Sequence, residues 1–400
     1  MVLWRFAGSA GGAQRQSQKA FAELEASYMR DQTHPPPWPI YYIAVRIMHF
    51  TQWLAMKLQL RPVFIMQTAA GFVRAQVLET IIQLDIPDVL AAGPRTSAEL
   101  AADKGSNKVL SKSGPEAHTL YRNNSNTAVL RADHPNCMRN LVQAVIMTGK
   151  PWLNHLTWAM QKDKSVNGQT GPDTPPRLMA EREFGGQSLW EWQAADPARD
   201  KIFNDGMAEI DKSAIYGVIH DHKWGQYKRL VDIGGGYGQF TKSILLNHDV
   251  PSAVVFDQPH VVEPARKALA DTPLKERIMF SGGSFFDAGT LPAGRDGDAF
   301  LLRQILHDWS DKQVIEILKS CRRAMGASSS RLLIVEQGVG NKLLDRICGA
   351  RQVDIHMMGA LNGAERSPQQ WQQLLSASGF AFNGVDYVRS PFNIVQALPI

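Results

Sequence analysis

Arg229-Leu-Val-Asp-Ile-Gly-Gly-Gly-Tyr-Gly-Gln-Phe240 is the stretch of sequence that decides the fold. An apolar run leads into glycines at every second position, and an amphipathic run starts at Phe240. This order predicts a strand, a tight turn and a helix, which together open a nucleotide-binding βαβ unit. Glycines in such a turn permit positive φ and let the backbone approach a ligand closely. The spacing is Asp232-x-Gly234-x-Gly236-x-Gly238.

The same spacing indicates which ligand the turn accepts. A dinucleotide fingerprint that started at Gly234 would need glycine at position 239, where the chain has Gln239. Asp232 at the strand end suits a cationic ligand without phosphate, because a carboxylate repels a pyrophosphate. The segment resembles the S-adenosylmethionine motif of class I methyltransferases. A glycine-rich turn that binds nothing is the alternative interpretation.

Composition is typical of a globular protein. Of the 400 residues, 44% are hydrophobic and 20% are charged, which allows two or three domains with sizeable cores. The net charge of +5 is modest, and no dense run of Lys and Arg indicates a nucleic-acid partner. Three cysteines without a CxxC pair indicate neither a disulfide framework nor a zinc site. We therefore expect a reducing, cytoplasmic location.

Two N-terminal stretches bear on location. The most apolar one, residues 40–60, is interrupted by polar side chains and predicts an amphipathic helix that packs on a partner surface, with no integral membrane segment. Residues 1–22 contain Arg5, Arg15 and Lys19 but no acidic residue. That composition is compatible with a mitochondrial transit peptide, but a frayed basic tail is the favoured interpretation.

Proline-rich and turn-forming stretches, together with changes in the apolar pattern, predict that the chain has three parts. Residues 1–39 form a tail and a proline-rich linker, residues 40–225 form a mainly helical domain, and residues 226–400 form the domain that contains the glycine motif. Within the helical part, Thr96 and Glu99 have the spacing of a capping box, and residues 200–220 have helical periodicity. Residues 165–176 are rich in turn formers and predict a surface loop.

From residue 226 onward, predicted strands alternate with predicted helices. This alternation predicts an α/β fold in which a parallel, doubly wound sheet is covered on both faces. The strands are expected at Arg229–Ile233, Ala253–Asp257, Ile278–Ser281, Asp298–Arg303, Arg331–Glu336, Ala381–Tyr387 and Asn393–Ala397. The helices are expected at Phe240–Asn247, His260–Asp271, Asp311–Met325, Asp345–Asn362 and Pro368–Ser378.

Chemistry-bearing side chains follow several of these strands. Asp257 ends the second strand, where an acidic residue hydrogen-bonds ribose hydroxyls in such sheets. His307 follows the fourth strand, Glu336 ends the fifth, and Glu365 precedes a helix. Because open α/β sheets bind ligands at the carboxyl ends of their strands, we expect the histidine and both glutamates at one rim. The carboxylates would orient the imidazole and support its protonated form.

Five segments in order resemble the caffeate-type small-molecule O-methyltransferases of plants and fungi, which are metal-independent. The resemblance covers residues 230 to about 380. The matching segments are Leu230–Gly238, Phe256–His260, Ile305–Asp311, Ile334–Glu336 and Gly363–Arg366. The resemblance implies S-adenosylmethionine as the methyl donor, a phenolic small molecule as the acceptor and no metal.

The family also implies roles for individual residues. His307 is the expected general base, flanked by Glu336 and Glu365. Ser284 stands where relatives usually have an acidic residue near the adenine, and Arg303 stands where they often have lysine. The expected donor site comprises Asp232, Gly234, Gly236, Gly238, Asp257, Ser284, Phe285, Arg303 and Asp308.

Relatives carry an N-terminal dimerisation and substrate-lid region with a winged-helix-like motif, so a homodimer is expected. Residues 101–118 are short for that motif, and Lys108–Pro115 lacks the pattern of a long helix. Either the winged-helix element is reduced, as we expect, or the chain lacks a segment there.

The expected reaction is in-line methyl transfer to a phenol that is deprotonated by neutral imidazole. A dry pocket favours it, and its expected lining is Met207, Trp309, Met357 and Met358. Core packing explains each of the three methionines equally well. Two alternatives remain at this stage. One is a repurposed enzyme of the same fold that catalyses decarboxylation, hydroxylation or rearrangement, and the other is a non-catalytic interaction protein.

Overall fold

A computed structural model of the chain describes residues 37–58, 65–66, 70–103, 120–157, 179–213, 215–269, 272–339 and 350–400. The basic N-terminal residues 1–22, the loop predicted at 165–176 and the segment Lys108–Pro115 lie outside these residues. The described residues fall into two compact units, which we treat separately. The first contains Trp53–Met147 and Asp196–Ser213, and the second contains Pro35–Gln52, Thr148–Ala195 and Ala214–Ile400. The functional roles predicted for residues 1–39, 40–225 and 226–400 stay predictions.

The first unit is mainly helical. The predicted capping box is confirmed, since the Thr96 N–H donates to Glu99 Oε2 (2.6 Å) and the Glu99 N–H donates to Thr96 Oγ1 (3.2 Å). A two-stranded antiparallel sheet pairs β1 (Arg95–Thr96) with β2 (Leu120–Tyr121). The helical elements that lie in or enter this unit are α4 (Gly71–Gln83), α5 (Ile86–Val89), η1 (Leu90–Ala92), α6 (Ser97–Asp103), α7 (Ser125–Ala128), α8 (Arg139–Leu153) and α12 (Pro197–Ser213).

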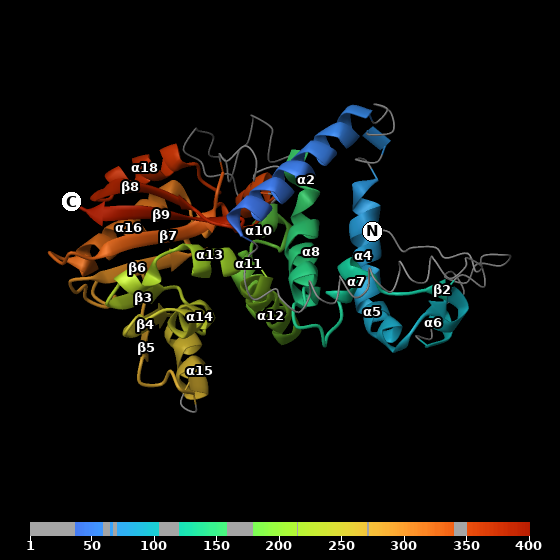
Figure 1. Cartoon of the computed structure of the whole chain (residues 1–400), viewed down its shortest axis with the longest axis horizontal. Coiled ribbons are helices and arrows are strands. Elements are labelled where there is room, and N and C mark those ends of the chain that lie inside the picture. The colour runs from blue at the N-terminus through green and yellow to red at the C-terminus, as the bar shows by residue number, and fades with distance from the viewer. Residues whose placement is uncertain are drawn as a thin grey trace. The chain divides into compact units, whose positions relative to one another are not determined.

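The second unit contains a seven-stranded sheet in the order β5-β4-β3-β6-β7-β9-β8 (Figure 1). The first five of these strands are parallel, as predicted, whereas β9 is antiparallel to both β7 and β8. The exception arises because β8 and β9 are joined by a short hairpin connection rather than by a helical crossover. The strands are β3 (Arg229–Ile233), β4 (Ser252–Asp257), β5 (Ile278–Gly282), β6 (Asp298–Arg303), β7 (Arg331–Gln337), β8 (Phe380–Tyr387) and β9 (Phe392–Pro399).

Helices cover both faces of this sheet (Figure 1). On one face, side chains of α16 (Asp311–Met325) and α18 (Pro368–Ser376) pack on β3, β6 and β7 in one buried cluster. On the other face lie α13 (Tyr216–Asp221), η4 (Trp224–Gln226) and α14 (Gln239–Asn247), while α15 (Pro259–Leu269) packs against β4 and β5. Central strands buried on both faces explain the continuous apolar runs in the sequence. The helix predicted over residues 200–220 is two helices, α12 and α13, which belong to different units.

A second apolar cluster in this unit surrounds Trp152, near the end of α8. It includes side chains of α10 (Met179–Glu183), α11 (Leu189–Ala194) and α17 (Ala350–Leu361). The chain approaches Trp152 so closely at Gly359 that a Cβ there would lie 2.6 Å from the indole Cζ3. Glycine at this point in α17 is therefore a packing requirement.

Gly359→Ala is expected to destabilise the protein by about 1–3 kcal/mol, because an extra methyl group in a closely packed core forces side chains out of position. Gly71→Ala in α4 is the matched control, since a Cβ at Gly71 meets nothing within 4 Å. Denaturant unfolding of both variants measures the difference. If both variants unfolded at the same denaturant concentration, the Trp152 side chain would have moved aside for the extra methyl group without a cost in stability.

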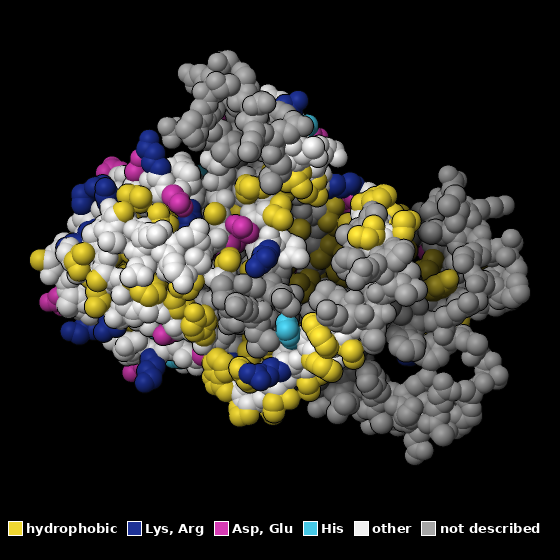
Figure 2. Space-filling model, turned by 90° about the horizontal axis from the view of Figure 1, so that it is seen from above, with side chains coloured by type: hydrophobic (Ala, Val, Ile, Leu, Met, Phe, Trp, Pro, Cys, Tyr) yellow, Lys and Arg dark blue, Asp and Glu magenta, His cyan; other side chains and the backbone are white. Residues whose placement is uncertain are grey.

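Helix α2 (Trp38–Leu58) carries many exposed apolar side chains. Figure 2 shows hydrophobic side chains exposed among polar ones on the face seen in that view. Those exposed on α2 include Trp38, Ile40, Tyr42, Ile43, Ile47, Met48 and Phe50. Among the described residues, no helix combines the length and the apolar character needed to cross a membrane.

Candidate active site

The candidate site lies where β3, β4, β6 and β7 end. The strand order reverses at β3, whose neighbours are β4 on one side and β6 on the other, and ligands bind at such switch points. The turn after β3 has Gly234, Gly236 and Gly238 at φ of +74°, +56° and +71°. A Cβ at Gly234 would lie 2.4 Å from Ile305 Cδ1, whereas one at Gly236 would meet nothing within 4 Å. The turn therefore packs tightly at Gly234 and has open space at Gly236.

Asp232 contacts both this turn and the helix that follows it. Its carboxylate is buried, and Oδ2 accepts a hydrogen bond of 2.6 Å from the Thr241 hydroxyl in the first turn of α14. A Cβ on Gly235 would lie 2.6 Å from the same oxygen. These contacts join the turn to the start of α14, and the predicted contact of Asp232 with the donor stays a prediction.

Asp257, at the end of β4, is positioned beside the open part of the turn. Its Oδ2 accepts the Gly236 N–H at 2.8 Å, and its Oδ1 accepts the Gln258 N–H at 2.7 Å. Each carboxylate oxygen keeps a second lone pair for another donor. This arrangement fits a ligand that brings hydroxyl groups to the turn.

An aromatic cluster follows β5 and β6. The Trp309 ring meets Phe285 at a centroid distance of 5.8 Å and Phe286 at 5.0 Å, both edge to face. The Ser284 hydroxyl accepts the Phe286 N–H at 3.3 Å, so it stabilises this turn. The Arg303 guanidinium lies over the Phe240 ring, 5.1 Å from its centroid.

His307 lies in a single 3-10 turn, η5 (Leu306–Asp308), directly after β6. The turn is entered through Gln304, whose φ of +50° is uncommon for a residue with a side chain. Glu336 Oε1 accepts the backbone N–H groups of Ile305, Leu306 and His307 at 3.2, 3.0 and 3.3 Å. One carboxylate oxygen thus holds the backbone that carries the histidine.

The imidazole is buried and surrounded by carboxylates. Nδ1 lies 2.8 Å from Glu365 Oε1 and 3.7 Å from Glu336 Oε2, and Nε2 lies 3.4 Å from Asp308 Oδ1. The Glu365 contact fixes the ring with Nδ1 as the donor, because an ionised carboxylate only accepts. The sequence-based prediction that His307, Glu336 and Glu365 share one rim agrees with these distances.

These neighbours control the charge of the imidazole. Burial by itself lowers the pKa of His307, but the charges of Glu336 and Asp308 and the hydrogen bond and charge of Glu365 outweigh it and raise that pKa to about 10. Burial raises the pKa of Glu336 to about 7 against the opposing effect of His307. Burial likewise raises the pKa of Asp308 to about 6. The cluster therefore holds an imidazolium firmly when no other cation is near.

Two supporting residues were missed by the sequence analysis. The guanidinium of Arg366, which is 2% exposed, donates to the carbonyl groups of Leu306 (2.9 Å) and Trp309 (2.7 Å), on both sides of His307. Asp354 Oδ1 on α17 accepts the Glu365 N–H at 2.9 Å. Arg366 follows Glu365 within the matching segment Gly363–Arg366. Its charge and its position in the sequence did not indicate which groups it would bind.

The predicted lining residues occupy different environments. Trp309 belongs to the aromatic cluster, and the Met357 carbonyl accepts the Gly363 N–H beside the histidine turn (3.1 Å). Met358 packs with the cluster around Trp152, as in the core-packing interpretation. Met207 lies on α12 in the other unit. Their contact with a substrate stays a prediction.

The residues present fit S-adenosylmethionine. The space at Gly236, the carboxylate of Asp257 and the aromatic rings of Phe285 and Trp309 are suited to the main chain, hydroxyls and ring of a nucleoside. The acidic side chains nearby suit its positive charge.

Comparison with known proteins agrees with this fit. An O-methyltransferase domain model matches residues 169–381. The chain is 33% identical over 347 residues to the phenazine O-methyltransferase PhzM of Lysobacter antibioticus, a match that covers 84% of this chain and 96% of the relative. It is 31% identical to the 8-amino-8-demethylriboflavin N,N-dimethyltransferase of Streptomyces davaonensis, covering 78% and 88% of the two chains.

Among solved structures, the crystal structure of LaPhzM covers 86% of this chain and 100% of its own, with a TM-score of 0.71 and 29% identity. The fold is thus that of the class I methyltransferases, with a Rossmann-like sheet and a mainly helical N-terminal region. Together with the domain match, these likenesses show that the chain belongs to the O-methyltransferase family and is an S-adenosylmethionine-dependent enzyme.

Proposed function

We propose that this enzyme methylates a phenolic hydroxyl of a small secondary metabolite and that His307 is the general base, as in the caffeate-type subgroup. The observation that carries the proposal is the buried imidazole whose Nδ1 lies 2.8 Å from Glu365 Oε1. That contact leaves Nε2 as the nitrogen that can take a proton from an acceptor. The name of the Lysobacter relative, a phenazine O-methyltransferase, supports an aromatic acceptor.

The mechanism follows from the charges around His307. A phenol has a pKa of about 10, so it is a weak nucleophile at neutral pH until a base removes its proton. Three carboxylates stabilise the imidazolium that forms when His307 takes this proton. Bound S-adenosylmethionine supplies an electrophilic methyl group on a cationic sulfur. A cation near the cluster offsets the carboxylate charge, and we infer that it lowers the pKa of His307 toward the neutral form needed in the base.

The substrate test uses donor labelled in its methyl group with a panel of catechols, hydroxycinnamates, hydroxyanthraquinones and hydroxyphenazines. We expect label in an extractable product only from acceptors with a free hydroxyl, with no change when a chelator is present. Each acceptor is paired with its own methyl ether as a control. Label transferred equally to the ethers or only to amines would overturn the proposal.

The rate of methyl transfer is expected to rise with pH as His307 loses its proton and becomes a base. Because neighbouring carboxylates raise the pKa of His307 in the free enzyme, the midpoint in kcat/KM lies above 6.5, the usual value for histidine. Glu365→Gln removes one of these charges, so the limb should move to lower pH by about 1–3 units. Profiles of kcat/KM against pH, measured for both proteins in the same buffers, check both statements. A midpoint that does not move on substitution would contradict them.

Donor binding is expected to depend on Asp257. Asp257→Asn keeps the size of the side chain but removes its charge, so affinity for S-adenosylhomocysteine should fall by about 10–100-fold, the equivalent of one charged hydrogen bond. Titration calorimetry measures this directly. Asp287→Asn is the matched control, since that exposed carboxylate caps a turn through the Gly289 N–H (2.9 Å).

Several finer predictions stay proposals. We propose a homodimer in which a second copy covers exposed apolar side chains of α2, and a cytoplasmic enzyme without a nucleic-acid partner. We also propose that the winged-helix element is reduced and that the predicted lining residues contact the substrate. The comparisons give no support to a repurposed catalyst or to a non-catalytic interaction protein.

A further inference from the structure

Three carboxylates lie against one imidazole at His307. Glu365 Oε1 lies 2.8 Å and Glu336 Oε2 lies 3.7 Å from Nδ1, and Asp308 Oδ1 lies 3.4 Å from Nε2. Glu336 Oε2 and Glu365 Oε2 are buried and accept no hydrogen bond from the described residues. Buried carboxylates with too few donors favour the uptake of positive charge. The excess of negative charge therefore holds a proton on the imidazole.

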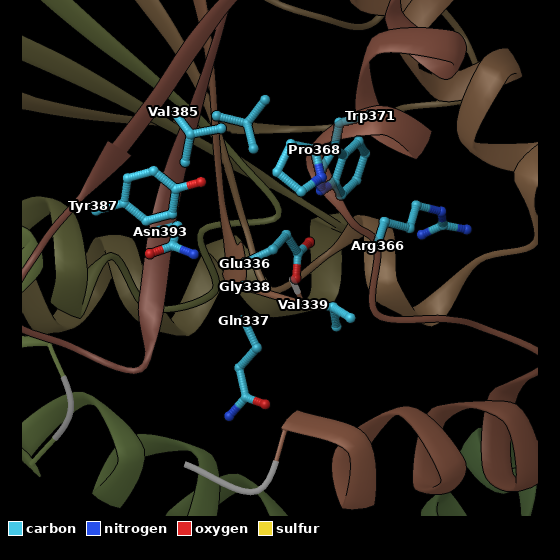
Figure 3. Close-up of a pocket in the computed structure, with 11 residues that line it drawn as sticks. Glu336, Gln337, Gly338, Val339, Arg366, Pro368, Trp371, Val385, Tyr387 and Asn393 are labelled. Carbon is cyan, nitrogen blue, oxygen red and sulfur yellow. The ribbon is translucent and has the colours of Figure 1, made fainter. Parts of the chain in front are cut away.

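The Arg366 guanidinium does little to offset this excess. Figure 3 shows its side chain extending away from Glu336. It donates to the carbonyl groups of Leu306 and Trp309, and it pairs with Asp311 at 2.9 Å. Its charge is therefore balanced by another carboxylate, outside the histidine cluster.

Helix α17 adds two ionisable groups beside the cluster. Burial and the charge of His307 lower the pKa of His356 to about 4, so this second histidine is neutral at physiological pH. Asp354 Oδ1 accepts the Glu365 N–H at 2.9 Å and is another acidic group. Neither supplies a positive charge, so the compensation depends on the His307 imidazolium.

The cluster adjoins the glycine turn that fits the donor. Ile305 connects the two, since its N–H donates to Glu336 Oε1 at 3.2 Å and a Cβ on Gly234 would lie 2.4 Å from its Cδ1. S-adenosylmethionine has a positive sulfur, whereas S-adenosylhomocysteine lacks only the methyl group and this charge. A second positive charge near an imidazolium lowers its pKa by about 1–3 units. The two ligands should therefore act differently on the protonation of His307.

One of the two imidazole protons can respond to that charge. The proton on Nδ1 is held in the contact with Glu365 Oε1, so the proton that a nearby cation displaces is the one on Nε2. Nε2 is also the nitrogen proposed to take the acceptor's proton. Because carboxylates raise the pKa of His307 to about 10 in the free enzyme, Nε2 is protonated there and cannot act as a base.

We propose that His307 loses its Nε2 proton to solvent when S-adenosylmethionine binds, and that the acceptor's proton then stays on Nε2 until the next donor binds. The inference rests on the proposed role of His307 as base. In the reaction the acceptor's O–H bond breaks and an O–C bond forms, while the donor's S–C bond breaks and leaves its electron pair on sulfur. The proton passes to Nε2, beside a product that is now neutral. Exchange of that product for a new donor restores the base and releases one proton in each cycle.

The first test is titration calorimetry of the full-length enzyme without acceptor. Binding heats measured in buffers of different ionisation enthalpy give the number of protons released. Release by S-adenosylmethionine should pass through a maximum of about 0.5–0.9 proton per site as pH is raised, the amount for a pKa shift of about 1–3 units. Over that range its affinity should rise by up to about tenfold per pH unit. S-adenosylhomocysteine should show little of either, and equal release by both ligands, or by neither, would overturn the proposal.

Matched variants locate the source of the proton. Glu365→Gln removes one carboxylate, so the imidazolium is held less firmly and the maximum should move to lower pH by about 1–3 units. Asp308→Asn should move it in the same direction, which guards against a local distortion in either variant. Glu183→Gln breaks a contact of the same length, 2.8 Å to His155, outside the cluster and should leave the maximum in place. A maximum that neither cluster variant moved would exclude His307 as the source.

The second test follows a single turnover with a pH indicator and methyl-labelled donor at neutral pH. When excess enzyme already bound to donor is mixed with acceptor, labelled product should form without proton release, and the proton should appear when fresh donor is added. A proton that appeared with the product, before any new donor, would overturn the proposal. Proton release on donor binding by an enzyme that methylated none of the acceptors would instead refute the proposed function.

Discussion

His307→Ala is expected to lower kcat for methyl transfer by about 10²–10⁴-fold, the usual contribution of a positioned general base. The variant loses the group that takes the acceptor's proton, while the glycine turn and Asp257 stay in place. Binding of S-adenosylhomocysteine should therefore change little. Quenched-flow assays with labelled donor measure the rate, and calorimetry measures the binding.

His155→Ala is the matched control for that loss. His155 pairs with Glu183 at 2.8 Å in the same unit but outside the cluster, and partly exposed pairs contribute little to stability. We expect wild-type rates from it. A fall in rate of less than about threefold in His307→Ala would be too small for general-base catalysis and would exclude that role.

Arg366→Leu is expected to destabilise the protein by about 3–5 kcal/mol, the range for breaking a buried charged network. The buried guanidinium donates to the carbonyl groups of Leu306, Ala364 and Trp309 and pairs with Asp311 at 2.9 Å. Removing it leaves those carbonyl groups buried without their donor, and the turn that carries His307 loses its support. Chemical denaturation measures the loss.

Arg351→Leu provides the comparison, because Arg351 is exposed on α17 and should change stability by about 0.5 kcal/mol at most. Arg366→Lys should recover only part of the stability, since an ammonium cannot reproduce the planar fork of a guanidinium. If Arg366→Leu and Arg351→Leu unfolded at the same denaturant concentration, the support assigned to Arg366 would be disproved.

Periodicity and strand-end position carried the prediction of the sheet and of the histidine cluster. The continuous apolar runs at β3, β6 and β7 are long enough to be recognised, and parallel strands bring their carboxyl ends to one rim. His307, Glu336 and Glu365 could therefore be placed together although 58 residues separate the first from the last.

The rest depends on three-dimensional contacts that no spacing encodes. Glu336 flanks the imidazole as predicted, with Oε2 3.7 Å from Nδ1. The sequence did not reveal that its Oε1 accepts three backbone N–H groups of the histidine turn. The sequence did not reveal that Asp232 Oδ2 accepts the Thr241 hydroxyl, and the predicted contact of Asp232 with the donor stays a prediction. The antiparallel end of the sheet follows from the β8–β9 hairpin, since strand content alone does not give direction.

The most direct test of His307 as the base uses acceptors of graded acidity. First-turnover rates of wild type and His307→Ala are measured on ring-substituted forms of the phenol that gives most product, with pKa values from below to well above the assay pH. The account predicts that the variant's deficit is large for weakly acidic phenols and nearly vanishes for those already ionised, which need no base. An equal deficit across the series would contradict it and assign His307 to substrate positioning instead.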